Sequence, residues 1–114
     1  MKIPVKIKIS IIVSVFNEKH SLHNCWKALR RIQSNLPKYR FNFIFVNDGS
    51  TDNSEAILHE LSQENKNVTH IKLSRNYGHE AAMLAGIDYA NGDAIICMDA
   101  DLQHPPEKIP EMVK

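Results

Sequence analysis

The sequence has few of the residues that mark disulfide-stapled or zinc-binding proteins. Among 114 residues there are only 2 cysteines, which are too few for a disulfide framework. Cys97 lies inside an apolar run, where a buried strand is expected. The 6 histidines are scattered along the chain and do not suggest a zinc site. We therefore expect a protein of a reducing, cytoplasmic compartment.

The sequence also lacks a large net charge and a long apolar segment. The formal net charge of +1 gives no electrostatic reason to expect nucleic-acid binding. The apolar run at residues 11–16 is interrupted by Ser14 and is too short to cross a bilayer. No signal peptide is visible, and we expect any membrane association to depend on segments that this chain lacks. With 43% hydrophobic residues, residues 1–114 are expected to form a single domain.

Apolar, β-branched segments alternate along the chain with segments of helical periodicity. The segments expected to be strands are residues 7–16, 41–46, 68–73 and 94–98. The segments expected to be helices are residues 21–36, a stretch after Asp52 that includes Leu61, residues 80–90, and a last helix from Pro106. This alternation predicts an α/β fold, with a Rossmann-like parallel sheet, flanking helices and right-handed crossovers.

Local features of three elements are also predicted. Asp52 and Glu55 have the spacing of a capping box at the start of the second helix. In the third helix, Met83, Leu84 and Ile87 are expected to pack inward. The uninterrupted apolar run at residues 94–98 has the length of a strand buried on both faces.

Polar side chains follow each predicted strand. They are Asn17 and Glu18 after the first, Asn47 and Asp48 after the second, Arg75 and Asn76 after the third, and Asp99 and Asp101 after the fourth. Ligands of α/β proteins bind at the carboxyl ends of the strands, so these four loops are expected to form one site. The same residue types are common in turns, and a turn role is the favoured interpretation for Asp52 and Ser54.

The acidic pair Asp99 and Asp101 admits two interpretations. Two carboxylates so near each other in the sequence suit a hard divalent ion such as Mg²⁺ or Mn²⁺, which completes its coordination shell with water and substrate phosphates. The alternative is an acidic turn that caps the following helix, and Asp-x-Asp alone would favour it. The three other polar loops expected at the same edge shift the balance toward a metal-bridged diphosphate site.

Four segments carry a more specific signal: residues 13–18 (VSVFNE), 46–52 (VNDGSTD), 74–93 (SRNYGHEAAMLAGIDYANGD) and 99–107 (DADLQHPPE). Through them the chain resembles the nucleotide-binding, N-terminal half of a family 2 glycosyltransferase with the GT-A nucleotide-diphospho-sugar transferase fold. The last two segments are especially similar to the branch that includes dolichyl-phosphate mannose synthases and bacterial polyprenyl-phosphate glycosyltransferases. Asn47 is a mild departure, because the family often has a second Asp there.

The resemblance implies a hexosyltransferase of cell-envelope polysaccharide synthesis. Such an enzyme transfers sugar, with inversion, from a UDP- or GDP-sugar to a polyprenyl-phosphate or saccharide acceptor. The implied nucleotide-binding residues are Asp48, which would read the base, Arg75 and Asp99, and we assign Asn17 and Glu18 to the same site. The implied ligands of a Mg²⁺ or Mn²⁺ ion are Asp99, Asp101 and Gln103.

Family members continue into an acceptor-binding half, so the catalytic base is expected beyond Lys114. We accordingly expect this chain to transfer no sugar alone, to self-associate through exposed apolar surface, and to lie at the cytoplasmic membrane face in a full-length protein.

Three other classes of protein are alternatives to a glycosyltransferase. A non-catalytic nucleotide-sugar binding or regulatory module is the serious alternative, because its donor site would look the same. A Rossmann dehydrogenase is disfavoured because residues 16–20 contain no glycine, and a zinc protease because Met83 stands where its second histidine is needed.

Overall fold

The computed structural model describes residues 7–100. Its elements, in chain order, are β1 (Ile7–Val15), α1 (Leu22–Asn35), β2 (Tyr39–Asn47), α2 (Ser54–Glu64), β3 (Val68–Lys72), α3 (His79–Tyr89) and β4 (Ala94–Asp99). The predicted alternation of strands and helices is confirmed, and the element ends differ from the predicted ends by only a few residues. The helix predicted from Pro106 lies outside the described residues.

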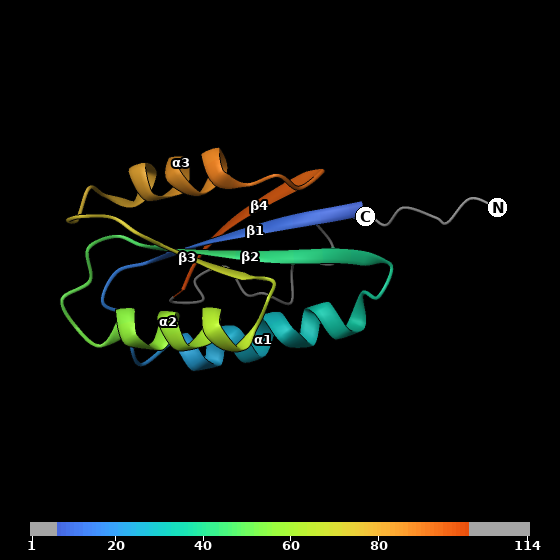
Figure 1. Cartoon of the computed structure of the whole chain (residues 1–114), viewed down its shortest axis with the longest axis horizontal. Helices are drawn as coiled ribbons and strands as arrows, with labels where there is room; N and C mark the ends of the chain where they lie inside the picture. Colours follow the sequence, from blue (N-terminus) through green and yellow to red (C-terminus); the bar gives the residue numbers. More distant parts are fainter. Residues whose placement is uncertain (1–6, 101–114) are drawn as a thin grey trace.

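The strands form one parallel sheet in the order β3-β2-β1-β4 (Figure 1). The chain places β2 and β3 on one side of β1 and then returns to place β4 on its other side. Strand order therefore reverses between β1 and β4, and this reversal is where α/β sheets open a crevice for ligands. The register across this point pairs Val13 with Met98 and Ser14 with Asp99. The predicted α/β fold and the central position of the first strand are both confirmed.

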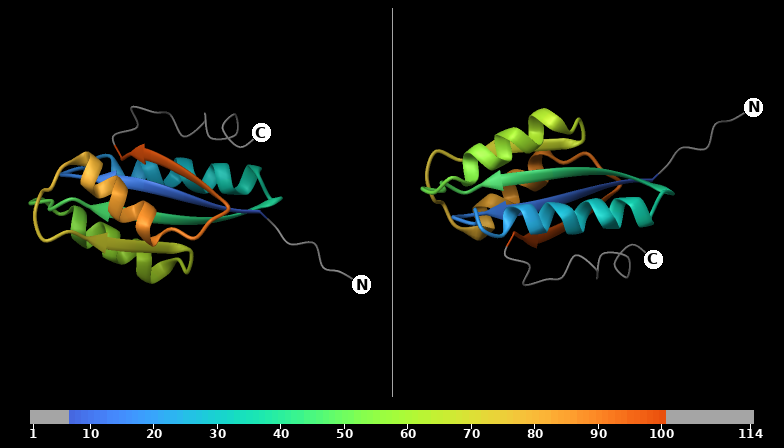
Figure 2. Two further views of the ribbon diagram at one scale, coloured as in Figure 1. Left: turned by 90° about the horizontal axis from the view of Figure 1, so that it is seen from above. Right: turned by 90° about the horizontal axis from the view of Figure 1, so that it is seen from below.

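Helices cover both faces of the sheet. α1 and α2 lie on one face and α3 lies on the other, as the views from above and below show (Figure 2). The face under α1 and α2 holds the larger core, in which Trp26 meets Phe43 edge to face with ring centroids 5.2 Å apart. Leu22, Trp26 and Leu29 recur at helical spacing, which explains why one side of α1 is buried.

α3 lies close to the sheet because two of its three buried residues are small. They are Ala82 and Gly86, beside the larger Met83, and a side chain at Gly86 would overlap Ile12 of β1. Burial of Met83 was predicted correctly. The predicted burial of Leu84 and Ile87 is wrong, because they are 66% and 41% exposed. The helix has apolar residues of its own on every side, so their spacing alone could not identify the face that packs on the sheet.

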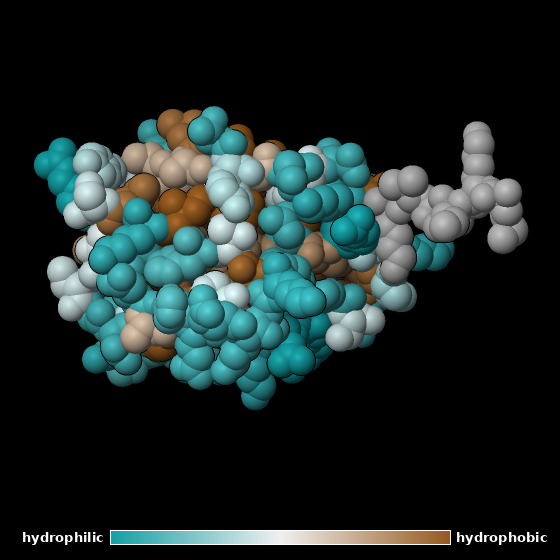
Figure 3. Space-filling model, viewed as in Figure 1, coloured by the Kyte–Doolittle hydropathy of each residue, from teal (hydrophilic) through white to brown (hydrophobic). Residues whose placement is uncertain are grey.

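The prediction that the fourth strand is buried on both faces is also wrong. In the sheet of the described residues, β4 is an edge strand, with Ile95 42% exposed and Cys97 exposed, while Met98 is buried. An apolar run indicates a strand but does not reveal which elements cover it. Apolar groups are also exposed on the side of the molecule where α3 lies. The space-filling view shows them as brown atoms at the top, the position of α3 in Figure 1 (Figure 3).

The predicted capping box of the second helix does not form. α2 begins at Ser54, and its N-cap residue, Asn53, makes no side-chain cap. Asp52 instead accepts hydrogen bonds from the backbone N–H groups of Ser54 (2.9 Å) and Lys19 (3.2 Å). Asp52 therefore joins the loop after β2 to the loop after β1, which agrees with the structural turn role favoured for it.

Within residues 7–100, no helix has the length and apolar character that a membrane span needs.

Candidate functional site

A pocket of about 320 Å³ opens at the carboxyl ends of β1, β2 and β4 and the start of α3. The residues that line it are Ser14, Val15, Phe16, Glu18, Asp48, Asn76, Gly78, His79, Asp99 and Ala100. Four loops that are distant in sequence contribute to this lining, which is the convergence expected for a parallel sheet. Among the residues assigned to the site from the sequence, the structure brings Glu18, Asp48, Asn76 and Asp99 together here.

Carboxylates dominate the described lining of this pocket. Glu18, Asp48 and Asp99 supply them, His79 supplies an imidazole, and no lysine or arginine among residues 7–100 belongs to the lining. A diphosphate entering such a pocket would meet carboxylates and be repelled unless a cation came with it. The donor set therefore fits a hard divalent cation that binds between carboxylate and phosphate oxygens.

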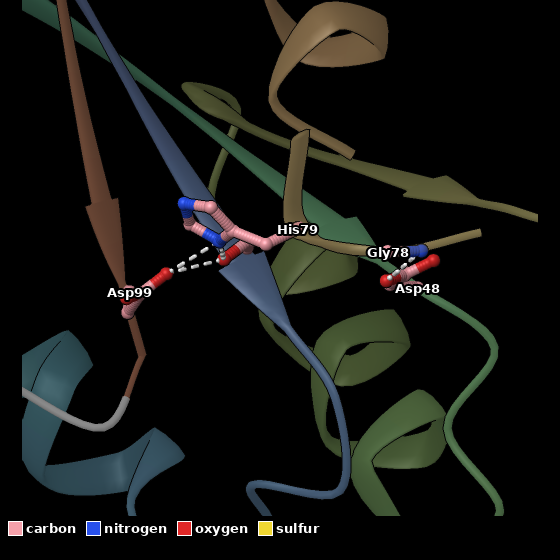
Figure 4. A network of polar contacts seen from close by, with 5 residues as sticks. Asp48, Gly78, His79 and Asp99 are labelled. Atoms are coloured by element: carbon pink, nitrogen blue, oxygen red, sulfur yellow. Dashed lines mark hydrogen bonds and ion pairs between the residues drawn. The ribbon is translucent and has the colours of Figure 1, made fainter. Parts of the chain in front are cut away.

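Asp99 takes part in a three-residue polar network at the end of β4 (Figure 4). The Ser14 hydroxyl donates to Oδ1 of Asp99 over 2.7 Å, and Nδ1 of His79 lies 2.9 Å from the same oxygen. Ser14 Oγ and His79 Nδ1 are themselves 3.1 Å apart. Three elements, β1, α3 and β4, thus meet at one carboxylate oxygen.

Asp48 anchors the loop that follows β3. Its carboxylate, on a residue only 3% exposed, accepts hydrogen bonds from the backbone N–H groups of Tyr77 (2.8 Å) and Gly78 (3.0 Å). Figure 4 shows this carboxylate beside Gly78. Gly78 has φ of +103°, a conformation that residues with side chains rarely adopt. Asp48 therefore shapes the pocket wall, and its predicted contact with a nucleotide base remains a prediction.

Asn17 lies beside the pocket rather than in its lining. With φ of +53°, it turns its side-chain oxygen toward the loop after β2, where it accepts the N–H groups of Thr51 (2.7 Å) and Asp52 (3.2 Å). Its own N–H donates to the Ser50 hydroxyl over 3.0 Å. The structure thus gives Asn17 a role in joining two site loops, while its direct contact with a nucleotide stays a prediction.

Glu18 combines a structural contact with a place in the pocket. Its backbone N–H donates to the hydroxyl of the buried Ser54 over 3.0 Å. Ser54 is therefore a structural residue, as expected, and it holds Glu18 at the pocket wall.

Arg75 lies outside this pocket, in an adjoining hollow of about 520 Å³ that also includes Phe16 and Asn76. Its guanidinium group sits over the Tyr77 ring, 4.7 Å from the centroid. Because Phe16 and Asn76 line both hollows, one extended ligand could reach both. The predicted nucleotide contact of Arg75 would use this second hollow.

Asp101 and Gln103, the other expected metal ligands, lie outside the described residues. In the part of the chain that the structure describes, no group of three or more His, Cys, Asp or Glu side chains has the arrangement of a metal site. Asp99 is thus the one expected ligand that the structure places.

Ser14 and His79 were not identified from the sequence. One signal was available for Ser14, because a hydroxyl inside the apolar central strand needs a polar partner. His79 follows a glycine at a helix start and gave no comparable signal. Their meeting at Asp99 depends on the β1–β4 register, which connects residues 85 positions apart.

Comparisons with known proteins agree with this geometry. The family described as "Glycosyl transferase family 2" matches residues 10–114. A Bacillus subtilis protein named "Uncharacterized glycosyltransferase YkcC" is 45% identical over 95% of this chain, and the bactoprenol glucosyl transferase of Shigella phage SfV is 41% identical over 95%. These matches cover 33% and 35% of the two relatives, so the chain spans about a third of their length.

Among solved structures, the mannosyltransferase PcManGT from Pyrobaculum calidifontis, in complex with GDP-Man and Mn²⁺, superposes with a TM-score of 0.78. The match covers 96% of this chain and 32% of that one, at 17% sequence identity. At this identity the match shows a shared fold. The family match covers most of the chain, including all the loops that line the pocket. The chain therefore belongs to glycosyl transferase family 2 and has the parallel-sheet architecture of the GT-A glycosyltransferases.

Proposed function

We propose that this chain holds the nucleotide-diphosphate sugar of an inverting hexosyltransferase, with a Mg²⁺ or Mn²⁺ ion between its carboxylates and the donor diphosphate. The observation that carries the proposal is a carboxylate-lined pocket at the β1–β4 reversal of strand order, to which the described part of the chain contributes no lysine or arginine. In a site of this charge, a diphosphate binds more favourably with a divalent cation than without one. The solved neighbour, which is in complex with GDP-Man and Mn²⁺, supports the same pairing.

The residues of this chain would divide the work in the following way. Asp99, together with Asp101 and Gln103, would hold the ion, while Asp48 and Arg75 would hold the nucleotide. When bound, the ion would stabilise the negative charge that develops on the departing nucleoside diphosphate. Asp48 also keeps residues 77–78 in place, so the pocket wall is formed before the donor arrives.

We propose a polyprenyl phosphate as the acceptor of the whole protein, with a saccharide as the other possibility. The support is the 41% identical phage relative, which is named a bactoprenol glucosyl transferase. A lipid phosphate is already ionised near neutral pH, so it needs little help from a general base. A cytoplasmic location remains a prediction from the cysteine content.

The experiment is a calorimetric titration of the 114-residue chain with UDP and with GDP, in Mn²⁺, in Mg²⁺ and in chelator. We expect one of the nucleotides to bind measurably tighter with the metal than with the chelator. Asp101→Asn should lose most of that gain, because it keeps size and hydrogen bonding but loses the charge. Asp48→Ala should weaken binding with and without metal.

Asp88→Asn is the matched control, since Asp88 is exposed on α3 and does not line the pocket. It should titrate as the parent does. Binding of both nucleotides that is equally weak with metal and with chelator would contradict the proposal.

A further inference from the structure

We infer that Ser14 and His79 are positioning residues that hold Oδ1 of Asp99, so that its second oxygen, Oδ2, is left for the metal-bound donor. The inference rests on the proposed function, because it needs Asp99 to face the ion. Its geometrical basis is that two donors from different elements converge on Oδ1, at 2.7 Å from Ser14 and 2.9 Å from His79. Among residues 7–100, no hydrogen bond to Oδ2 is formed.

The Ser14 side of this arrangement is fixed by the sheet. Ser14 lies on the central strand, pairs in register with Asp99, and is only 9% exposed. Its backbone oxygen accepts the N–H of Ala100 over 3.1 Å, which fixes the chain on both sides of the carboxylate contact. The hydroxyl therefore reaches Asp99 with little freedom to move elsewhere.

The His79 side of this arrangement comes from the start of α3. His79 is the first residue of α3, so the preceding Gly78 and the loop held by Asp48 determine where the ring starts. Because the Ser14 hydroxyl donates its only proton to Oδ1, all three contacts are satisfied when Nδ1 of the ring carries a proton that it shares between Oδ1 and Ser14 Oγ. Asp99 is thus held at Oδ1 by two side chains, while Oδ2 accepts no hydrogen bond from residues 7–100.

Groups that hydrogen-bond to a metal-binding carboxylate determine its orientation, and their removal weakens metal binding without removing a metal ligand. Losses of ten- to a hundredfold in metal affinity are typical for such partners. The imidazole is about half exposed, with 55% of the side chain accessible, so water would replace part of its contact. We therefore expect the low end of this range, about tenfold.

The test compares His79→Ala, His79→Asn and Ser14→Ala with the parent chain. Asn places its amide nitrogen at the same branch point as Nδ1 of His, so it can donate to Asp99 where Ala cannot. His59→Ala is the matched control, because His59 is an exposed helical histidine on α2 and lies outside the pocket. The thermal unfolding midpoint of each variant shows whether its fold is retained.

The readout is the Mn²⁺ affinity at saturating UDP or GDP, measured from the electron paramagnetic resonance signal of free Mn²⁺. We expect about a tenfold loss for His79→Ala and for Ser14→Ala, and an affinity near the parent's for His79→Asn and His59→Ala. If Ser14→Ala does not fold, the two His79 variants still decide the question.

Two results would overturn the inference alone. One is parent-like Mn²⁺ affinity in His79→Ala, and the other is a folded His79→Asn that binds Mn²⁺ as poorly as His79→Ala. If the parent itself binds no Mn²⁺ with either nucleotide, the proposed function fails and the inference fails with it. The parent titration therefore separates the two failures.

Discussion

Replacing Asp48 by alanine should destabilise the chain strongly, because this carboxylate is buried and holds two backbone N–H groups. Hydrogen bonds to a charged group contribute about 1.5–3 kcal/mol each. Asp48 accepts two of them, from Tyr77 and Gly78. Tyr77 is 50% exposed, so its freed N–H can reach water by a small movement of the loop. We therefore expect a loss of about 2–4 kcal/mol in the free energy of unfolding, less than two full hydrogen bonds.

A loss of that size is a large part of the total stability of a domain of this length, which is about 5–15 kcal/mol. It corresponds to a fall of roughly 10–25 °C in the unfolding midpoint. Asp48→Asn keeps one acceptor but turns an N–H donor toward the other backbone N–H, so it should lose about 1–2 kcal/mol.

The assay is urea unfolding followed by the fluorescence of Trp26, the single tryptophan, which is buried against Phe43. Amide hydrogen exchange at Tyr77 and Gly78 reports the loop directly and should quicken in Asp48→Ala. Asp88→Ala is the control, and as an exposed substitution it should stay within about 0.5 kcal/mol of the parent. An Asp48→Ala chain that is as stable as this control, with both amides still protected, would refute the reasoning.

Three further predictions concern the fold. Gly86→Ala should lower the free energy of unfolding by about 1–2 kcal/mol, because overlap with Ile12 outweighs the better helix propensity of alanine, and urea unfolding measures it. Burial lowers the pKa of His70 below its usual 6.5, and its Nε2 has no hydrogen-bond partner in the described structure. Folding therefore favours the neutral form of His70. Its contribution to the free energy of unfolding is fully present above pH 6.5 and is lost as the pH falls through the lower pKa of the folded state. His70→Gln should flatten the curve of unfolding free energy against pH in that window. Ile95→Lys should reduce self-association in sedimentation experiments, because it puts a charge on the exposed edge strand β4, and a parent that is strictly monomeric at high concentration would contradict this.

Much of the architecture could be predicted because local chemistry specifies it. The first strand was expected to be central from its apolar run, and Ile11, Ile12 and Val13 are indeed fully buried with strands on both sides. The site could be located because polar residues after parallel strands must meet at one edge of the sheet. Glu18 and Asp99 meet there for that reason.

Other features depend on contacts that no local pattern encodes. The apolar run of β4 looks the same whether or not another element covers the strand, so the exposure of Ile95 could not be anticipated. The helix α3 has apolar residues on every side, and the close fit of Gly86 against Ile12 decides which side faces inward. The contact of Ser14 with Asp99 required the register of two strands that are far apart in sequence.

The central claim is that a metal-bound nucleotide lies at the carboxyl ends of β1, β2 and β4. The most direct measurement is the broadening of backbone amide resonances by Mn²⁺, recorded with UDP or GDP present and compared with Mg²⁺. We predict the strongest broadening at the amides of Val15, His79 and Ala100, which line the pocket, and no effect at Lys66 and Asn91, which line a separate hollow formed largely by the amino-terminal ends of the strands. Broadening centred on Lys66 and Asn91, or broadening that does not depend on the nucleotide, would contradict it.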